Sequence, residues 1–328
     1  MNIHLPLFSQ RRRQAVAAIA LGLSGSCSQS QYPKLAGRYA ADEVAAAVEL
    51  APMGGIAYRL CRKQAAYAFL VKAQQSDVEP PPWPRWYGEE PGPDTPAASL
   101  RPVTWSQTCD ESARAAQVVH TVCRGLRAHG KALASLASGP GQPLDTSAIE
   151  NTTNLVLFQV AGMSTTSGVG KAAAQVGSNF ANASKVFLDA YRTRKLEEVV
   201  RDSKTCIDST FDDLLALQKN MVLVLADVRH RRTFVVRGMA SAPLPPRGDR
   251  GLLLGEAMDA VGETDRTLQA TDDALTTYKI AITRLKAAYA SLAKLAAADP
   301  RDPGSAKDVA GGLDDLESSL QDVTELEQ

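Results

Sequence analysis

Residues 252–298 decide the fold and read LLLGEAMDAVGETDRTLQATDDALTTYKIAITRLKAAYASLAKLAAA. Apolar side chains recur in this stretch every three or four residues, which places them on one face of an α-helix. They fall largely on the a and d positions of a heptad repeat: Val261, Leu268, Leu275, Tyr278, Ile282, Leu285, Tyr289, Leu292 and Ala296. The stretch therefore predicts a long helix with a coiled-coil-like seam, ended by Pro300 and Pro303.

The composition of the 328-residue chain favours helices throughout. Alanine is abundant and only 5% of the residues are aromatic, which suits helices packed through small side chains better than a sheet. We expect an all-α fold, an elongated helical bundle of five to seven helices with two long helices as its spine. The 36 basic and 36 acidic residues balance, which argues against a chain-wide surface for nucleic acid.

Proline-rich segments divide the predicted bundle, which spans residues 41–298. Residues 77–105 are expected to form a long Pro-rich loop and residues 240–251 a linker, because proline at such density excludes helix. A short linker is expected over 27–40, and an acidic C-terminal helix or tail over 299–328.

Two interruptions lie inside the helical pattern. Pro52 and the pair Gly54-Gly55 are expected to interrupt or kink the first helix of the bundle. The apolar pattern from Lys171 to Val236 fits either one long helix or a hairpin, and the polar segment near Asp202 is the candidate hinge.

The first 26 residues have the layout of a secretory signal peptide. Three arginines, Arg11 to Arg13, precede an apolar core over 15–23 and the small residues Ser24 to Ser26. The segment contains no acidic residue, so its removal leaves 33 basic against 36 acidic residues, a net charge of about −3. We expect export, with residues 1–26 removed.

Cys27 follows these small residues directly. The stretch Leu23-Ser24-Gly25-Ser26-Cys27 resembles the lipobox of bacterial lipoproteins, although that family has its large apolar residue three positions before the cysteine, and here Leu23 is four before. The resemblance implies a lipid on Cys27 and a periplasmic or outer-membrane protein held by that membrane anchor. Cleavage without lipidation, giving a simple periplasmic or secreted protein, is the alternative.

Four further cysteines suggest two disulfides in an oxidising compartment. Cys109 and Cys123 are 14 residues apart on one predicted helix, roughly 21 Å, which is too far for a bond. If the helices before and after the Pro-rich loop form a hairpin, Cys61 and Cys123 lie at similar heights. We therefore predict Cys61–Cys123 and Cys109–Cys206, with four buried thiols as the alternative.

The Pro-rich loop carries the candidate partner-binding residues. Trp83, Trp86 and Tyr87 combine apolar rings with polar tips, as residues at protein interfaces do. The alternative is that these rings fold back onto the bundle and are buried.

Other motifs point away from catalysis and cofactors. Around Gly168-Val169-Gly170-Lys171 the pattern of a phosphate-binding loop fails, because Thr165 and Ala172 stand at required Gly and Ser/Thr positions. His120 and His129 are nine apart on one helix and point in opposite directions, so they cannot share a metal. We interpret three carboxylate pairs as solvated helix faces and a basic cluster as a helix C-terminus; these are Asp212-Asp213, Asp272-Asp273, Asp314-Asp315 and the residues Arg229 to Arg232 around His230.

These observations predict a non-enzymatic envelope protein that binds an unidentified protein partner, as an immunity protein or a scaffold, without nucleotide, metal or other cofactor. A second hypothesis uses the apolar, Gly/Ala-rich segment 155–183. A long bundle with one such stretch is similar in layout to the α-helical pore-forming cytolysins, which implies a membrane-perturbing protein. The third is a hydrolase whose site follows no motif.

Overall fold

The computed structural model describes residues 31–75, 107–139, 146–163, 165–191, 195–241, 265–298 and 303–326. In these ranges the regular structure is helical, without a strand, in eight segments: α2 (Gln31–Leu50), α3 (Met53–Gln75), α4 (Gln107–Ala137), α5 (Ser147–Ala161), α6 (Gly168–Tyr191), α7 (Leu196–Ser241), α9 (Asp265–Ala297) and α10 (Pro303–Leu326). If α2 and α3 are counted as one bent helix, the described residues contain seven. The predicted all-α bundle is confirmed.

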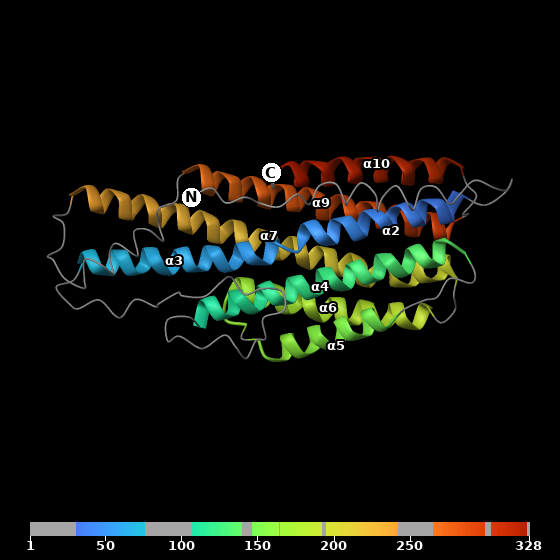
Figure 1. Cartoon of the computed structure of the whole chain (residues 1–328), viewed down its shortest axis with the longest axis horizontal. Coiled ribbons are helices and arrows are strands. Elements are labelled where there is room, and N and C mark those ends of the chain that lie inside the picture. The colour runs from blue at the N-terminus through green and yellow to red at the C-terminus, as the bar shows by residue number, and fades with distance from the viewer. Residues whose placement is uncertain are drawn as a thin grey trace, which may run out of the picture.

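The helices run along the long axis of an elongated molecule (Figure 1). Helix α7, with 46 residues, is the longest, and it packs against α6, α9 and α3. Helix α4 packs against α2, α3, α5 and α6, while α10 covers α9 and α2. Helices α10 and α5 therefore lie at opposite edges of the bundle, and α4 and α7 lie inside it (Figure 1).

Glycines allow the central helices to approach closely. A Cβ atom built on Gly125 of α4 would lie 1.9 Å from Cζ of Phe180 on α6, and one on Gly130 would lie 2.8 Å from the carbonyl oxygen of Ala40 on α2. These contacts put α6 and α2 directly against α4. Elsewhere in the core, large side chains that are fully buried fill the space between the helices, among them Tyr32, Tyr39, Tyr289, Phe187 and Phe211.

Local chemistry sets two of the helix ends. Helix α4 ends at Ala137 and is followed by Gly139, whose φ of 106° lies in the left-handed region that glycine adopts without strain. Helix α10 begins at Pro303, a position where the missing N–H of proline costs nothing. Pro300 lies outside the described residues, and α9 stops at Ala297, as the proline pattern predicts.

The predicted boundaries of the bundle are wrong at both ends. Residues 31–40 belong to α2 and are not a linker, since Tyr32, Ala36 and Tyr39 face the core and are fully buried. Helix α10 is the predicted C-terminal helix, but it packs against α9 and α2 as part of the bundle. The predicted linker over 240–251 overlaps the end of α7, which continues to Ser241; its remaining residues lie outside the described ranges, as does the loop over 77–105.

Residues 171–236 form a hairpin, which resolves the alternative left open by the sequence. Helix α6 ends at Tyr191 and α7 begins at Leu196, so the hinge expected near Asp202 is wrong. Asp202 lies within α7, where its carboxylate accepts a hydrogen bond from Arg201. A prediction from polar residues alone puts the turn in the wrong place, because the outer face of a bundle helix is also polar.

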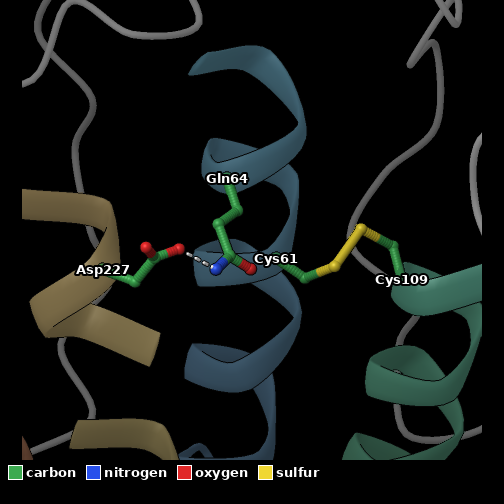
Figure 2. The surroundings of a disulfide bond; sticks show 4 residues. All are labelled: Cys61, Gln64, Cys109 and Asp227. Atoms are coloured by element: carbon green, nitrogen blue, oxygen red, sulfur yellow. Dashed lines mark hydrogen bonds between the residues drawn. A yellow bond between two sulfur atoms is a disulfide. The ribbon is translucent and has the colours of Figure 1, made fainter. Parts of the chain in front are cut away.

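One disulfide joins Cys61 of α3 to Cys109 of α4, and both predicted pairings are wrong (Figure 2). Cys123 is a buried thiol and Cys206 a half-buried one. The predicted register put the two ends of the hairpin at equal height. In the structure α3 continues for 14 residues beyond Cys61, whereas α4 begins two residues before Cys109, so α3 overshoots the start of α4. The exclusion of Cys109–Cys123 is confirmed.

The second half of α3 is held on two sides. Opposite the disulfide, the side-chain amide of Gln64 donates a hydrogen bond to the carboxylate of Asp227 on α7 (Figure 2). Asp227 also accepts a 2.7 Å bond from Arg231 of its own helix. These contacts fix α3 between α4 and α7.

Candidate functional site

A groove opens where the chain bends between α2 and α3. It has a volume of about 420 Å³ and lies between these two helices and the middle of α4. Its lining residues are Ala47 and Val48 from α2, Ala51 and Pro52 from the bend, Gly55, Tyr58 and Arg59 from α3, and Ala116, Gln117, His120, Cys123, Arg124 and Arg127 from α4. This volume is within the range of sites for small ligands.

The bend itself creates the groove. Helix α2 ends at Leu50, and Pro52 interrupts the helical hydrogen bonds before α3 begins at Met53. Just beyond the bend, a Cβ on Gly54 would lie 2.7 Å from the Cα atom of Ala116, so α3 touches the backbone of α4 there. Farther along, the Cys61–Cys109 disulfide also joins these two helices. The groove is thus bounded by the close contact between α3 and α4. It lies one to two helical turns from the disulfide that joins the same two helices.

The walls of the groove are apolar and its edge is basic. Arg59, Arg124 and Arg127 are exposed, and no carboxylate is found among the described residues that line the groove. Glu49 lies next to Val48 in the sequence, but it is buried and does not line the groove. The edge is therefore basic, and two of its guanidinium groups, those of Arg59 and Arg124, already interact with other groups of the protein.

Burial shifts the pKa values of two side chains in or near the groove. Burial, followed by the nearby Arg59 guanidinium, lowers the pKa of Lys63 to about 8. Burial raises the pKa of the Cys123 thiol to about 12, so this side chain stays neutral and acts as an apolar wall. Next to the groove the guanidinium of Arg62 lies 5.8 Å from the ring centre of Tyr58.

A second polar cluster is enclosed in the core. Nδ1 of His129 lies 2.6 Å from a carboxylate oxygen of Glu43, and both side chains are buried. The rings of Phe187 and Tyr289 lie 3.6 and 6.2 Å from the imidazole ring, centre to centre. Burial raises the pKa of Glu43, and the adjacent His129 opposes that rise. The small cavity beside His129 measures about 10 Å³, room for one water at most, so this pair has no space for a substrate.

The N-terminus of α6, where the glycine-rich motif lies, is already capped by an anion of the protein. The backbone N–H groups of Thr166 and Ser167 donate to the two carboxylate oxygens of Glu111, over 3.2 and 2.9 Å. The hydroxyl of Ser167 accepts a 3.0 Å bond from the N–H of Gly170. Because Glu111 occupies the place of a phosphate, the motif is a helix cap.

The remaining charged motifs make surface pairs between helices. Asp212 pairs with Lys286, Asp272 with Arg229, and Asp314 with Arg38, over 2.5, 3.0 and 2.5 Å. The interpretation of the Asp pairs as solvated faces fits these contacts. The placement of Arg229 to Arg232 at a helix C-terminus is wrong, because α7 continues to Ser241.

The two histidines of α4 are separated as the sequence predicts. His120 lines the groove, and His129 lies in the core with Glu43. Among the described residues there is no cluster of three His, Cys, Asp or Glu side chains that could hold a metal ion.

The segment 155–183 divides into two parts with different surroundings. Its α6 part is mostly buried, with Val169, Val176 and Phe180 in the core. Its α5 part exposes Leu155, Leu157 and Phe158, the last by 74%. One described helical stretch, Gln31–Ala65, covers α2 and the first part of α3 and is long and apolar enough to cross a membrane by length and composition. Of its most apolar window, 56% is buried in the bundle, as in a core helix.

The groove was not among the sites expected from the sequence. The expected partner-binding residues Trp83, Trp86 and Tyr87, and the expected lipidation site Cys27, lie outside the described residues. The kink at Pro52 was the available signal, but only the structure shows that α4 brings Arg124 and Arg127 to it. The sequence matches no known family model, and comparison with curated proteins and with solved structures finds no match.

Proposed function

We propose that this chain is an exported bacterial envelope protein, anchored by a lipid on Cys27, that acts as a non-enzymatic binding module. The groove between α2, α3 and α4 is the observation that carries the proposal. It combines apolar walls with a few polar side chains at its edge, which is the usual composition of a site for binding. The signal-like segment 1–26 and the lipobox-like stretch before Cys27 support the cellular location.

The rigidity of the groove also supports binding over catalysis. Its side chains stand on three helices, two of which are joined by a disulfide, so the site is already formed without a ligand. The closely paired carboxylate and imidazole of Glu43 and His129 are enclosed elsewhere in the core. Immunity protein and scaffold are both roles that such a module can fill.

Fractionation of the native host tests the location. The protein should sediment with membranes as a chain that begins at Cys27 and carries a lipid-sized mass increment. The Cys27→Ser variant should appear in the soluble periplasmic fraction. A full-length chain in the cytoplasm would contradict export, and a soluble wild-type chain would contradict the anchor.

Site-specific photo-crosslinking tests the binding role. A photoreactive residue at Tyr58, in the groove, should give an adduct in the host envelope, whereas the same residue at the exposed Lys219 of α7 should not. Equal labelling at the two positions would count against the groove. If the Trp83→Ala/Trp86→Ala variant keeps the adduct and its partner, the Pro-rich loop is not the contact site.

The exposed side chains of α5 favour a second candidate function, contact with a membrane. Helix α5 packs only on one side, against α4 and α6, and leaves Leu155, Leu157 and Phe158 at the surface. Under this hypothesis the protein releases dye from liposomes and the Leu155→Ser/Phe158→Ser variant does not. Leu223→Ser, on α7 and 61% exposed, is the matched control. Equal release by all three proteins, or none by the wild type, would eliminate the candidate.

A further inference from the structure

We propose that the C-terminal helix α10 is a pH-sensitive clasp on α2, in which Arg38 holds carboxylates of α10 while Asp42 is protonated and turns to Asp42 when that carboxyl ionises. The inference goes beyond the binding groove and involves none of its lining residues. It is carried by a cluster of one arginine and three carboxyl groups where α10 packs against α2, and by the place of α10 at the edge of the bundle (Figure 1).

Arg38 is the charged link between the two helices. Its Nη2 atom lies 2.5 Å from a carboxylate oxygen of Asp314 and 2.9 Å from one of Glu317. These two acids are three residues apart on α10, so one guanidinium group reaches both. The three side chains are 36%, 68% and 55% exposed, so each ion pair contributes little to stability by itself. Such weak contacts exchange partners at little cost, which suits a switch.

Asp42 lies one helical turn after Arg38, on the same face of α2. One of its carboxylate oxygens is buried and makes no hydrogen bond to the part of the chain that the structure describes. An ionised carboxylate in this position is costly, because that oxygen is cut off from water and has no donor. Burial raises the pKa of Asp42 from 3.8 to about 7; Arg38 offsets part of the rise, and Glu317 and Asp314 add to it. The docked helix therefore favours the protonated carboxyl.

Charged groups on the other helices packed against α2 are held by different partners. On α4, His129 pairs with Glu43 inside the core. On α9, Arg284 donates to the backbone oxygen of Asp315 over 2.6 Å and to the hydroxyl of Ser319, both on α10. Neither acceptor ionises, so the contact of α10 with α9 is the same at every pH. The contact that changes with pH is the one with α2.

Release of α10 reverses the conditions around Asp42. The carboxyl regains water and loses two acidic neighbours, while Arg38 loses both partners, so the guanidinium and the ionised Asp42 pair along α2. Docking of α10 is thus coupled to the uptake of one proton. The docking equilibrium is most favourable below pH 3.8, weakens by up to about tenfold per pH unit as the pH rises, and levels off above about pH 7.

The open clasp exposes an apolar surface. Val309, Leu313, Leu316 and Leu320 are buried and lie along one side of α10, which packs on α9 and α2. Release uncovers this stripe and the surface beneath it. A single amphipathic helix that leaves its neighbours also loses the hydrogen-bond protection of its backbone amides, so the opening can be measured.

Hydrogen exchange of the purified full chain, followed by mass spectrometry between pH 5 and pH 8 and corrected for the intrinsic rate at each pH, tests the clasp. Peptides from α10 should exchange faster than peptides from the core helix α6 by about tenfold or more, because α10 opens locally. The protection of α10 should fall by about tenfold or more between these pH values. Equal protection of the two helices at each pH would mean that α10 opens only when the whole protein unfolds, which overturns the proposal.

Two variants assign the titration to one carboxyl. Asp42→Asn should keep α10 protected from pH 5 to pH 8, because the amide stays neutral. Asp315→Asn, which removes a carboxylate at an exposed position of α10, is the matched control and should keep the wild-type pH profile. Circular dichroism checks that each variant is folded. If Asp42→Asn keeps the wild-type profile, or Asp315→Asn loses it, Asp42 is not the switch and the proposal fails.

Two arginine variants test the exchange of partners. Arg38→Gln should lower the protection of α10 by about threefold to tenfold at pH 5 and change it little at pH 8, where the guanidinium has Asp42 as its other partner. Arg284→Gln should lower it by the same factor at both pH values, because its acceptors do not ionise. If Arg38→Gln acts equally at the two pH values, or at neither, Arg38 does not change partners and the clasp is wrong.

Discussion

Two adjacent glycines at the bend differ in the space that they leave for a side chain. At Gly54 a Cβ would lie 2.7 Å from the Cα atom of Ala116 and 2.9 Å from its carbonyl oxygen, and a backbone cannot yield as a flexible side chain can. At Gly55 the same atom would meet only Nη1 of Arg59, at 3.5 Å. We expect Gly54→Ala to lower the free energy of unfolding by about 1–3 kcal/mol.

The matched variant is Gly55→Ala, which should leave stability unchanged or raise it by up to about 1 kcal/mol, because alanine favours helix. Urea unfolding of both variants measures the difference. Equal stability of the two proteins would contradict the close contact between α3 and α4.

Asp42, on α2, should make stability depend on pH. Burial, opposed by Arg38 and supported by Glu317 and Asp314, raises its pKa from 3.8 to about 7. Because the folded-state pKa is the higher one, folding favours the protonated carboxyl. Its contribution is fully present below pH 3.8 and is lost as pH rises through about 7.

Replacing Asp42 by Asn should therefore reduce the loss of stability between pH 4 and pH 8, by on the order of 2 kcal/mol. Urea unfolding at several pH values measures this slope. Asp202→Asn, at an exposed position of α7, serves as the control for the loss of one carboxylate. A wild-type slope in the Asp42→Asn variant would show that Asp42 is not the group responsible.

At the scale of elements, the disulfide reports the register of α3 against α4. The Cys61–Cys109 bond closes a loop with a sequence separation of 48 residues. Its removal in the Cys61→Ser/Cys109→Ser variant should lower the free energy of unfolding by about 2–4 kcal/mol. A reductant should destabilise the wild type by a similar amount and leave this variant unaffected.

Cys206→Ser is the control, since Cys206 is a half-buried thiol outside the disulfide. It should behave like the wild type with and without reductant. If the reductant still destabilises the Cys61→Ser/Cys109→Ser variant and loses its effect in Cys206→Ser, the pairing is different and the overshoot of α3 is wrong.

The elements themselves were largely predictable, and their register was not. The apolar stripe around Leu275 and Leu285 identifies α9, because every third or fourth position must face the core. The offset of α3 from α4 depends on the long connection between them, whose length permits many offsets. No local pattern distinguishes a pairing of Cys61 with Cys109 from one with Cys123. The turn after Tyr191 was missed for a related reason, since the polar residues around Asp202 are those of a solvated helix face.

At the scale of the whole molecule, composition predicts the class of fold, whereas the site depends on how distant segments meet. Alanine and scarce aromatic residues predict helices packed at short range, and Gly125 against Phe180 shows that packing. The groove needs the bend at Pro52 and the arginines of α4 in one place. These lie more than 70 positions apart, so neither stands out as a site in the sequence alone.

The position at which the folded core begins separates the predicted signal segment from the structural helix α2. A chain that begins at Cys27 keeps all of α2, so it should unfold at the same temperature as the full chain. A chain that begins at Ala41 loses Tyr32 and Tyr39, both fully buried, the second 5.2 Å from the ring of Tyr289. Loss of one large core aromatic costs about 3–5 kcal/mol, so this truncation should lower the melting temperature by roughly 10 °C or more.

Thermal unfolding followed by circular dichroism compares the two truncations under the same conditions. The Tyr32→Ala/Tyr39→Ala variant of the longer chain is the control, because it removes the same rings and keeps the backbone of α2. If the chain beginning at Ala41 melts with the full chain, residues 31–40 are the linker that the sequence suggested, and the core of the bundle begins after them. If it melts with the tyrosine variant or below it, the core includes the first turns of α2, which then follow the expected cleavage site by only a few residues.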